Sequence, residues 1–196
     1  MTNDSRGAPP RGAPQQREST VATRRIYEGR VLNLDLDQVR FPNGSVGELE
    51  LIRHSGAAAV VPFLDDPRQN GARILLIRQY RYAADRFLYE IPAGRLEAGE
   101  SPVDCARREL LEEVGCTAES ILPLGGFFTT PGFIDEYIHV FVATGLTRGD
   151  ASPERDEFIH QESHTSQDAL RMIERGEIVD AKTIIALFLA DRLIRQ

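Results

Sequence analysis

Residues 94–116 read GRLEAGESPVDCARRELLEEVGC and contain the clearest structural signal in this chain of 196 residues. Ser101 can cap the start of a helix, and Pro102 suits the first helical position. Gly115 can adopt the left-handed backbone conformation that ends many helices. The stretch therefore predicts a helix from Ser101 to Val114.

The predicted helix separates an apolar stripe from a group of carboxylates. Successive residues turn by about 100°, so four apolar side chains share one face: Val103, Ala106, Leu110 and Val114. Glu109, Glu112 and Glu113 fall together on another flank, with Arg108 as the single cation placed near them. Like charges at this spacing repel one another, whereas clustered carboxylates suit hard ions such as Mg²⁺ or Mn²⁺. A solvated acidic face has the same pattern, so the helix alone leaves both interpretations open.

The residues before the helix favour a metal site. Residues 91–100 read IPAGRLEAGE, a glycine-rich loop that can bring backbone carbonyls and Glu100 to the carboxylate flank. A plain surface helix needs no such loop. Loop and helix together reproduce the pattern G-x5-E-x7-R-E-U-x-E-E-x-G-U, where U is apolar, with Cys116 as a small hydrophobic residue at the last position. The segment resembles the Nudix box.

This resemblance implies a Nudix-type α/β/α sandwich with a loop-helix-loop catalytic element that uses Mg²⁺, with Mn²⁺ as a further candidate. By position, it assigns metal ligation to one backbone carbonyl and three carboxylates: Ala93, Glu109, Glu112 and Glu113. Glu109 and Glu113 are the main ligands in this assignment, and Arg108 orients the carboxylates. Three other box positions are structural: Gly94, Glu100, which supports the loop, and Gly115, which ends the helix.

Cleavage of a diphosphate also needs a general base. The charge of a diphosphate repels an incoming hydroxide, so metal must neutralise its oxygens and acidify a water. In relatives the base often comes from a loop far downstream. The acidic segment before the C-terminal helices offers four carboxylates: Glu154, Asp156, Glu157 and Glu162. Its distance to the next helix selects Glu157, which joins Glu112 and Arg108 as a predicted catalytic residue; loop solubility is the other interpretation.

Outside the box, the chain resembles the ADP-ribose pyrophosphatase branch of the family over residues 24–195. Three stretches carry the resemblance: IRQYRY at 77–82 followed by EIPAG at 90–94, TPG at 130–132 with Pro131 fifteen residues after the box, and RGEIVDAKT at 175–183. The resemblance implies cleavage of ADP-ribose to AMP and ribose 5-phosphate. Other nucleotide sugars or dinucleotides, such as GDP-mannose, UDP-glucose or NADH, are alternative substrates. A non-catalytic module that senses a metabolite is a third alternative, and the complete set of box glutamates favours an enzyme.

Three residues are candidates for substrate binding. Arg81 can pair with a phosphate as a fork donor, and a surface arginine at a strand end is the plainer interpretation. Glu50 and Glu136 match positions that contact the ribose or terminal sugar in relatives, although both also suit ordinary exposed strand residues. One departure is Leu49, which stands where the branch often has Arg.

Composition narrows the class of partner. The formal net charge is −7 and no Lys/Arg-rich block occurs, so neither nucleic acid nor an anionic membrane is favoured over a small nucleoside diphosphate derivative. No apolar run approaches the roughly 20 residues of a membrane span, and the N-terminus lacks the apolar region of a signal peptide. We therefore expect a cytoplasmic protein, with Cys105 and Cys116 as reduced core thiols.

The chain is predicted to have three parts. Residues 1–20 are rich in Pro, Gly, Arg and Gln and are expected to form a disordered tail. Residues 21–55 are expected to form a small N-terminal antiparallel β hairpin domain, with strands Ile26 to Val39 and Val46 to Arg53 around an Asn-Gly turn. The resemblance implies that this domain is exchanged between the subunits of a homodimer. Residues 56–196 form the catalytic domain.

The catalytic domain is predicted to have the α/β (α+β) class. Strands are expected in five stretches: Ala57 to Leu64, Arg73 to Gln79, Ile121 to Phe128, Glu136 to Ala143 and Glu157 to Glu162. The first two are expected to form a hairpin with a longer loop. Helices at about Ser166 to Arg175 and Ala181 to Arg195 follow the box helix. This order predicts a mixed sheet sandwiched by helices.

Overall fold

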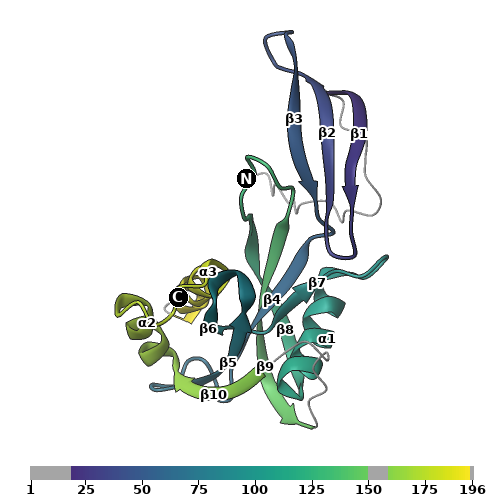
Figure 1. Cartoon of the computed structure of the whole chain (residues 1–196). Helices are drawn as coiled ribbons and strands as arrows, with labels where there is room; N and C mark the ends of the chain where they lie inside the picture. Colours follow the sequence, from purple (N-terminus) through teal and green to yellow (C-terminus); the bar gives the residue numbers. More distant parts are fainter. Residues whose placement is uncertain (1–18, 150–158, 195–196) are drawn as a thin grey trace, which may run out of the picture.

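The computed structural model of the chain describes residues 19–149 and 159–194. It consists of an α/β/α sandwich and a separate three-stranded sheet that stands away from it (Figure 1). The sandwich and its mixed sheet confirm the predicted fold class. No helix in the described residues is long and apolar enough to cross a membrane.

The separate sheet is formed by the first three strands in the order β1-β2-β3, all antiparallel: β1 (Thr20–Glu28), β2 (Asn33–Arg40) and β3 (Val46–Arg53). The predicted single strand from Ile26 to Val39 is wrong, because the chain reverses between Gly29 and Leu32, where the amide of Gly29 donates to the carbonyl of Leu32 (3.0 Å). A Cβ at Gly29 would lie 2.6 Å from the ring of Tyr27, so a larger residue in this tight turn would displace that ring. Apolar residues follow Gly29, so the sequence pattern does not indicate the turn.

The sandwich is built around β4 (Ala57–Pro62), whose six residues are all buried. β4 pairs in parallel with β9 (Tyr137–Arg148) and antiparallel with the short β7 (Ala93–Arg95), and β8 (Cys116–Phe128) completes the order β7-β4-β9-β8. The β4–β9 pair makes this sheet mixed. Strands that are buried on both faces lack polar alternation, which agrees with the apolar sequence of β4.

A second sheet has the order β10-β5-β6, from β10 (Ile159–Thr165), β5 (Arg73–Arg81) and β6 (Arg86–Glu90). The short 3-10 helix η1 (Tyr82–Ala84) joins β5 to β6. The predicted hairpin of β4 with β5 is therefore wrong, and a single bridge between Phe63 and Ile74 links them. Because a strand has only two edges, and β9 and β7 occupy those of β4, β5 pairs elsewhere. Sequence reasoning also missed β6 and β7, which are too short to show a clear alternation.

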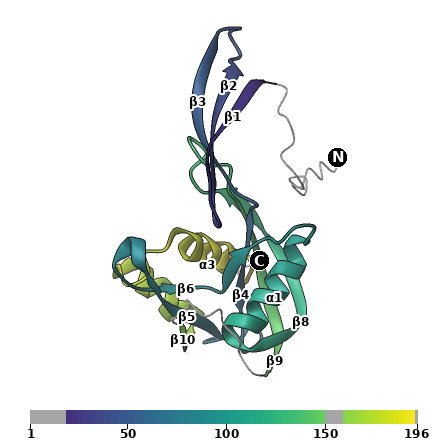
Figure 2. The same cartoon turned by 45° about the vertical axis from the view of Figure 1, so that its right-hand side comes forward.

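In the part of the chain that the structure describes, three α-helices cover the two faces of the sandwich: α1 (Pro102–Val114), α2 (Ser166–Glu174) and α3 (Ala181–Ile194). Alternate residues of β4 point to opposite cores. Ala58 and Val60 pack with Leu110 of α1, whereas Ala59 and Val61 pack with residues of α2 and α3. Figure 2 shows α1 and α3 on opposite sides of the strands. Cys105 and Cys116 are buried free thiols in the α1 core, as expected.

Candidate functional site

The ends of α1 fix the register of the box glutamates. The Ser101 hydroxyl accepts a hydrogen bond from the amide of Asp104 (3.3 Å), and Gly115 ends the helix in the left-handed conformation with φ 64°. The amide of Gly115 donates to the carbonyl of Leu111 (2.9 Å). Both predicted helix ends are confirmed. The carboxylates of the box therefore take the helical spacing on which the metal assignment depends.

Arg108 lies at the centre of the polar side of the box. Its Nε and Nη2 donate to the two carboxylate oxygens of Glu100 (2.9 and 3.1 Å), and its Nη1 donates to both Glu109 and Glu112. Nη2 also donates to the carbonyl of Arg95 in β7 (3.0 Å). The hydrogen bonds to Glu100, followed by the charge of Glu109, raise the pKa of Arg108. This permanent cation thus ties the loop before the helix to three carboxylates.

Glu109 and Glu113 are buried, with 7% and 1% of their surface exposed, whereas the side chain of Glu112 is 39% exposed. Oε2 of Glu113 accepts a hydrogen bond from the amide of Ala93 (2.9 Å). Glu109 packs against Gly94 so closely that a Cβ there would lie 1.8 Å from its Oε1. A larger residue at position 94 would therefore push the Glu109 carboxylate away from the loop backbone.

The donor set is suited to a hard divalent cation in its chemistry, since it consists of carboxylates beside a backbone loop. Within the described ranges, however, no three His, Cys, Asp or Glu side chains stand in ready-made ligand geometry. The hydrogen bonds explain this arrangement, because Glu109 and Glu112 turn toward Arg108 while Glu113 turns toward Ala93. In this arrangement two of the three carboxylates, Glu109 and Glu112, converge on Arg108.

Arg81 ends β5 and lies beside the box. Its Nε and Nη2 each donate to one carboxylate oxygen of Glu90, both at 2.7 Å. These hydrogen bonds, and the charges of Glu90 and Glu113, raise the pKa of the Arg81 guanidinium. Because the charge of Glu113 acts on Arg81, the guanidinium interacts electrostatically with α1. Sequence reasoning singled out Arg81 but missed Glu90, although Glu90 belongs to the EIPAG stretch.

The structure places Glu50 and Glu136 at neighbouring elements, without a contact between their side chains in the described part of the chain. Glu50 is an exposed residue of β3, and Glu136 accepts a hydrogen bond from the hydroxyl of Thr129 (2.9 Å). Two residues after Glu50, the amide of Ile52 donates to the carbonyl of Phe133 (2.7 Å). The end of β3 is thus joined to the loop that leads to Glu136.

The predicted base Glu157 lies outside the described residues, as do Glu154 and Asp156. Glu162 of the same acidic segment lies in β10 and accepts a hydrogen bond from the hydroxyl of Tyr89 (3.1 Å). β10 also reaches the box helix, because the side-chain amide of Gln161 donates to the carbonyl of Glu113 (3.1 Å). Sequence reasoning did not identify Gln161, since no local pattern indicates this contact.

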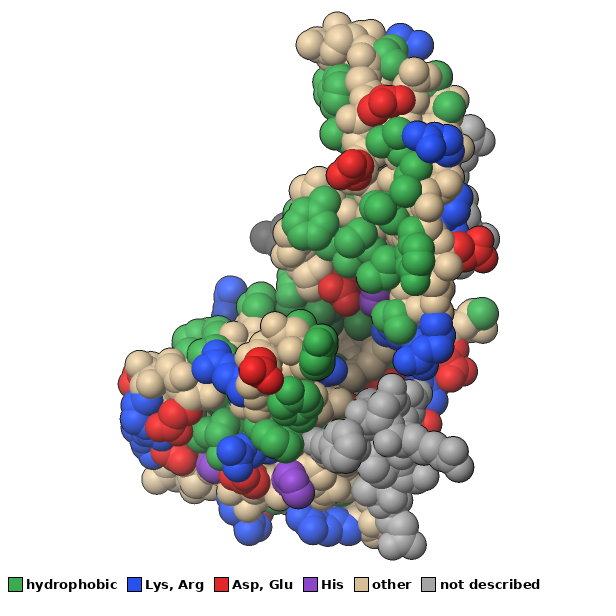
Figure 3. Space-filling view, viewed as in Figure 1, with side chains coloured by type: hydrophobic (Ala, Val, Ile, Leu, Met, Phe, Trp, Pro, Cys, Tyr) green, Lys and Arg blue, Asp and Glu red, His purple; other side chains and the backbone are tan. Residues whose placement is uncertain are grey.

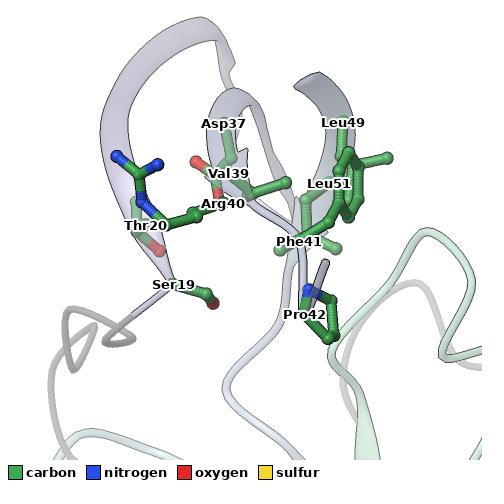
Figure 4. Close-up of a pocket in the computed structure, with 9 residues that line it drawn as sticks. All are labelled: Ser19, Thr20, Asp37, Val39, Arg40, Phe41, Pro42, Leu49 and Leu51. Atoms are coloured by element: carbon green, nitrogen blue, oxygen red, sulfur yellow. The ribbon is translucent and has the colours of Figure 1, made fainter. Parts of the chain in front are cut away.

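A hollow of about 540 Å³ lies on the separate sheet (Figure 4). Asp37 and Val39 of β2 and Leu49 and Leu51 of β3 line it together with Phe41. Its described lining residues belong to the segment 19–51, so it is distinct from the box. Figure 3 shows hydrophobic side chains gathered farther down, where the separate sheet approaches the sandwich.

Known proteins resemble this chain over most of its length. A sequence model of the NUDIX domain matches residues 53–187. An ADP-ribose pyrophosphatase of Bacillus subtilis is 40% identical over 172 residues, which cover 87% of this chain and 90% of the relative. A methanol dehydrogenase activator of Bacillus methanolicus is 41% identical with the same coverage. A crystal structure of an ADP compounds hydrolase has a TM-score of 0.78 and 23% identity, covers 93% of this chain and 96% of that chain, and shares the fold.

Proposed function

Because this chain belongs to the Nudix family, we propose that it hydrolyses the diphosphate of ADP-ribose to AMP and ribose 5-phosphate with the help of Mg²⁺. The geometry of the box carries this proposal: Glu109 packs on Gly94, Glu113 binds the amide of Ala93, and Arg108 joins three carboxylates. The substrate is supported by the relative from Bacillus subtilis, and by an ADP-ribose pyrophosphatase of Mycobacterium tuberculosis that is 39% identical over 84% of this chain and 79% of the relative.

We assign metal binding to Glu109, Glu112 and Glu113, together with the carbonyl of Ala93. A divalent cation held there would neutralise diphosphate oxygens and acidify a water. A bound cation would compete with Arg108 for Glu109 and Glu112, whereas Arg108 also donates to both oxygens of Glu100. The contact with Glu100 would then still join the loop to the helix. Mn²⁺ has the same ligand preference and is the second candidate.

The remaining assignments concern substrate and base. Arg81 provides a guanidinium beside the box for a phosphate oxygen. Glu50 and Glu136 provide acceptors for sugar hydroxyls at the junction of β3 with the sandwich. Glu157 is proposed as the general base, because the acidic segment 154–162 leads into β10, which contacts α1 through Gln161.

We also propose a homodimer in which the separate sheet contacts a second copy of the chain. Large apolar side chains of this sheet and its turns are exposed in the single chain: Val21, Ile26, Tyr27, Val31, Leu32, Phe41, Val46 and Leu49. Among the described residues these side chains have no covering layer, and a partner layer would bury them. The hollow on this sheet would give that contact a concave centre.

A substrate panel with Mg²⁺ tests the proposed activity. We expect AMP and ribose 5-phosphate from ADP-ribose, with much slower turnover of GDP-mannose, UDP-glucose and NADH. Hydrolysis in ¹⁸O-labelled water, followed by mass spectrometry of both products, identifies the phosphorus atom that is attacked. Exclusive cleavage of another nucleotide would overturn the choice of substrate, and binding of ADP-ribose without any turnover would favour a metabolite sensor.

A further inference from the structure

Glu90 is a buried carboxylate that is paired with two cations. It ends β6 with 1% of its surface exposed, and it accepts the fork of Arg81 through both oxygens. Nζ of Lys182, near the start of α3, donates to Oε2 of the same carboxylate. A buried carboxylate is costly unless it is paired, and one guanidinium would suffice for that purpose. The second cation therefore calls for an explanation.

Lys182 is held in a closed polar network rather than in solvent. Its side chain is 14% exposed, and Nζ also donates to Oδ2 of Asp180 (3.1 Å). The same Asp180 oxygen accepts the hydroxyl of Thr183 (2.7 Å), whose oxygen in turn accepts the amide of Ile91 (3.0 Å). The network thus joins the start of α3 to the residue that follows Glu90, and it fixes the ammonium against that carboxylate.

The fork with Glu90 leaves one end of Arg81 available. Nε and Nη2 are used, whereas Nη1 has no acceptor among residues 19–149 and 159–194. The side chain is 41% exposed, and the charge of Glu113 acts on it. A guanidinium held by one edge can offer its other edge to a phosphate. Its attraction for an anion is weak, however, if the carboxylate beside it is not compensated.

We propose that Glu90 and Lys182 are positioning residues for phosphate recognition: Glu90 fixes the direction of the Arg81 guanidinium, and Lys182 cancels the charge of Glu90 so that Arg81 keeps its attraction for the diphosphate. This inference rests on the proposed function. The two roles depend on each other, because Glu90 without Lys182 holds Arg81 in place but neutralises it. Removal of both charged groups restores the net charge around Arg81, where Asp180 remains as the other carboxylate.

The inference is tested by Lys182→Met, Glu90→Gln and the double variant with ADP-ribose and Mg²⁺. Lys182→Met should raise KM about tenfold and change kcat less than about threefold, because an uncompensated carboxylate opposes an approaching anion. The double variant should return KM to within about threefold of the parent protein. A purely structural network predicts the opposite, with the double variant worse than either single variant, and that result would overturn the proposal.

Two further variants complete the kinetic test. Lys182→Arg retains the charge and should keep KM within about threefold of the parent. Arg68→Met removes a cation from an exposed ion pair with Asp66, in the loop before the other end of β5, and should leave KM unchanged. An equal rise of KM in Arg68→Met and Lys182→Met would show a general charge effect and would refute the proposal. If the parent protein does not hydrolyse ADP-ribose, the proposed function itself fails.

Lysine modification tests the pairing without any turnover. Lys182 is the only lysine in the sequence, so an amine-reactive reagent followed by mass spectrometry reports on one side chain. Slow labelling in the folded parent and at least fivefold faster labelling in Glu90→Gln would support the Glu90–Lys182 contact. Equal rates in the two proteins would overturn the proposal even if Lys182→Met did not fold.

Discussion

The backbone amide of Ala93 donates a 2.9 Å hydrogen bond to Oε2 of Glu113, which joins the loop before the box to the helix inside it. Glu113 is nearly fully buried, so this contact lies under the surface of the site. The neighbouring carbonyl of Pro92 accepts a hydrogen bond from the amide of Val60 in the central strand β4 (3.0 Å). The position of one box glutamate is therefore coupled through the loop to the core of the sandwich.

This coupling predicts that Glu113→Gln impairs turnover without unfolding the protein. The glutamine oxygen can still accept the amide of Ala93, but the charge for metal binding is lost. We expect kcat to fall by about 10²- to 10³-fold and the Mg²⁺ requirement to rise, with a smaller loss for the more exposed Glu112→Gln. Turnover across a Mg²⁺ titration measures both effects. Glu174→Gln, at an exposed site in α2, is the control. Full activity in both box variants would refute the metal assignment.

Gly94→Ala is expected to damage the site more than the fold. The added Cβ would lie 1.8 Å from Oε1 of Glu109, and this atom is the end of a flexible side chain that can swing away. The expected result is at least a tenfold loss of kcat, with Tm lowered by only a few degrees. Kinetics and thermal unfolding of the same sample separate the two effects. Gly149→Ala, whose Cβ would make only an ordinary 3.6 Å contact, serves as the comparison. A normal kcat in Gly94→Ala would show that the position of Glu109 is not critical.

The box helix could be predicted because its signals are local. Ser101 and Gly115 mark its two ends, and the register between them places Glu109 and Glu113 on one flank. Strand pairing depends on contacts that are remote in sequence. β4 is followed directly by a loop and β5, as in a hairpin, yet its edges pair with β9 and β7.

The contacts of the site follow the same rule: those between residues near in sequence could be predicted, and those between remote residues could not. Glu100 and Arg108 are eight residues apart within one recognisable pattern, so the pairing of this arginine with a carboxylate could be predicted. The contact of Lys182 with Glu90 spans 92 residues and depends on how α3 packs beside the end of β6. A lysine after Asp-Ala gives no indication of its partner. The pairing of the Arg81 guanidinium with Glu90 could not be predicted for the same reason.

Acid should weaken the separate sheet through Asp35. Burial opposes ionisation of this carboxyl, but hydrogen bonds from Arg25 and Arg53 outweigh it and hold the pKa of Asp35 below its ordinary value of 3.8. A depressed pKa contributes stability that is fully present above the unfolded value and is lost as the pH falls toward the folded value. We therefore expect stability to fall below about pH 4, and to fall less steeply in Asp35→Asn.

Urea unfolding at a series of pH values, followed by a signal from the separate sheet, measures this effect. Asp35→Asn should be less stable than the parent protein near neutral pH, since it leaves Arg25 and Arg53 without their shared partner. Glu48→Gln, at an exposed position of β3, is the control and should follow the parent curve. Parallel pH curves for the parent protein and Asp35→Asn would contradict the assignment.

Leu49→Asp is expected to separate the proposed homodimer into single chains. Leu49 lines the hollow on the separate sheet and is 45% exposed, so a partner that covers this face would bury it. A new carboxylate in such a contact would be desolvated without a cation opposite, which strongly disfavours association. Sedimentation should give twice the chain mass of 21.9 kDa for the parent protein and the single mass for the variant. Leu122→Asp, on β8 outside this sheet and 55% exposed, should remain dimeric. A dimer that survives Leu49→Asp would show that the interface lies elsewhere. A parent protein that stays monomeric at all concentrations would refute the homodimer.

If the separate sheet also helps to enclose the substrate, KM should rise in Leu49→Asp together with dissociation, because each site would then lose residues supplied by the second copy.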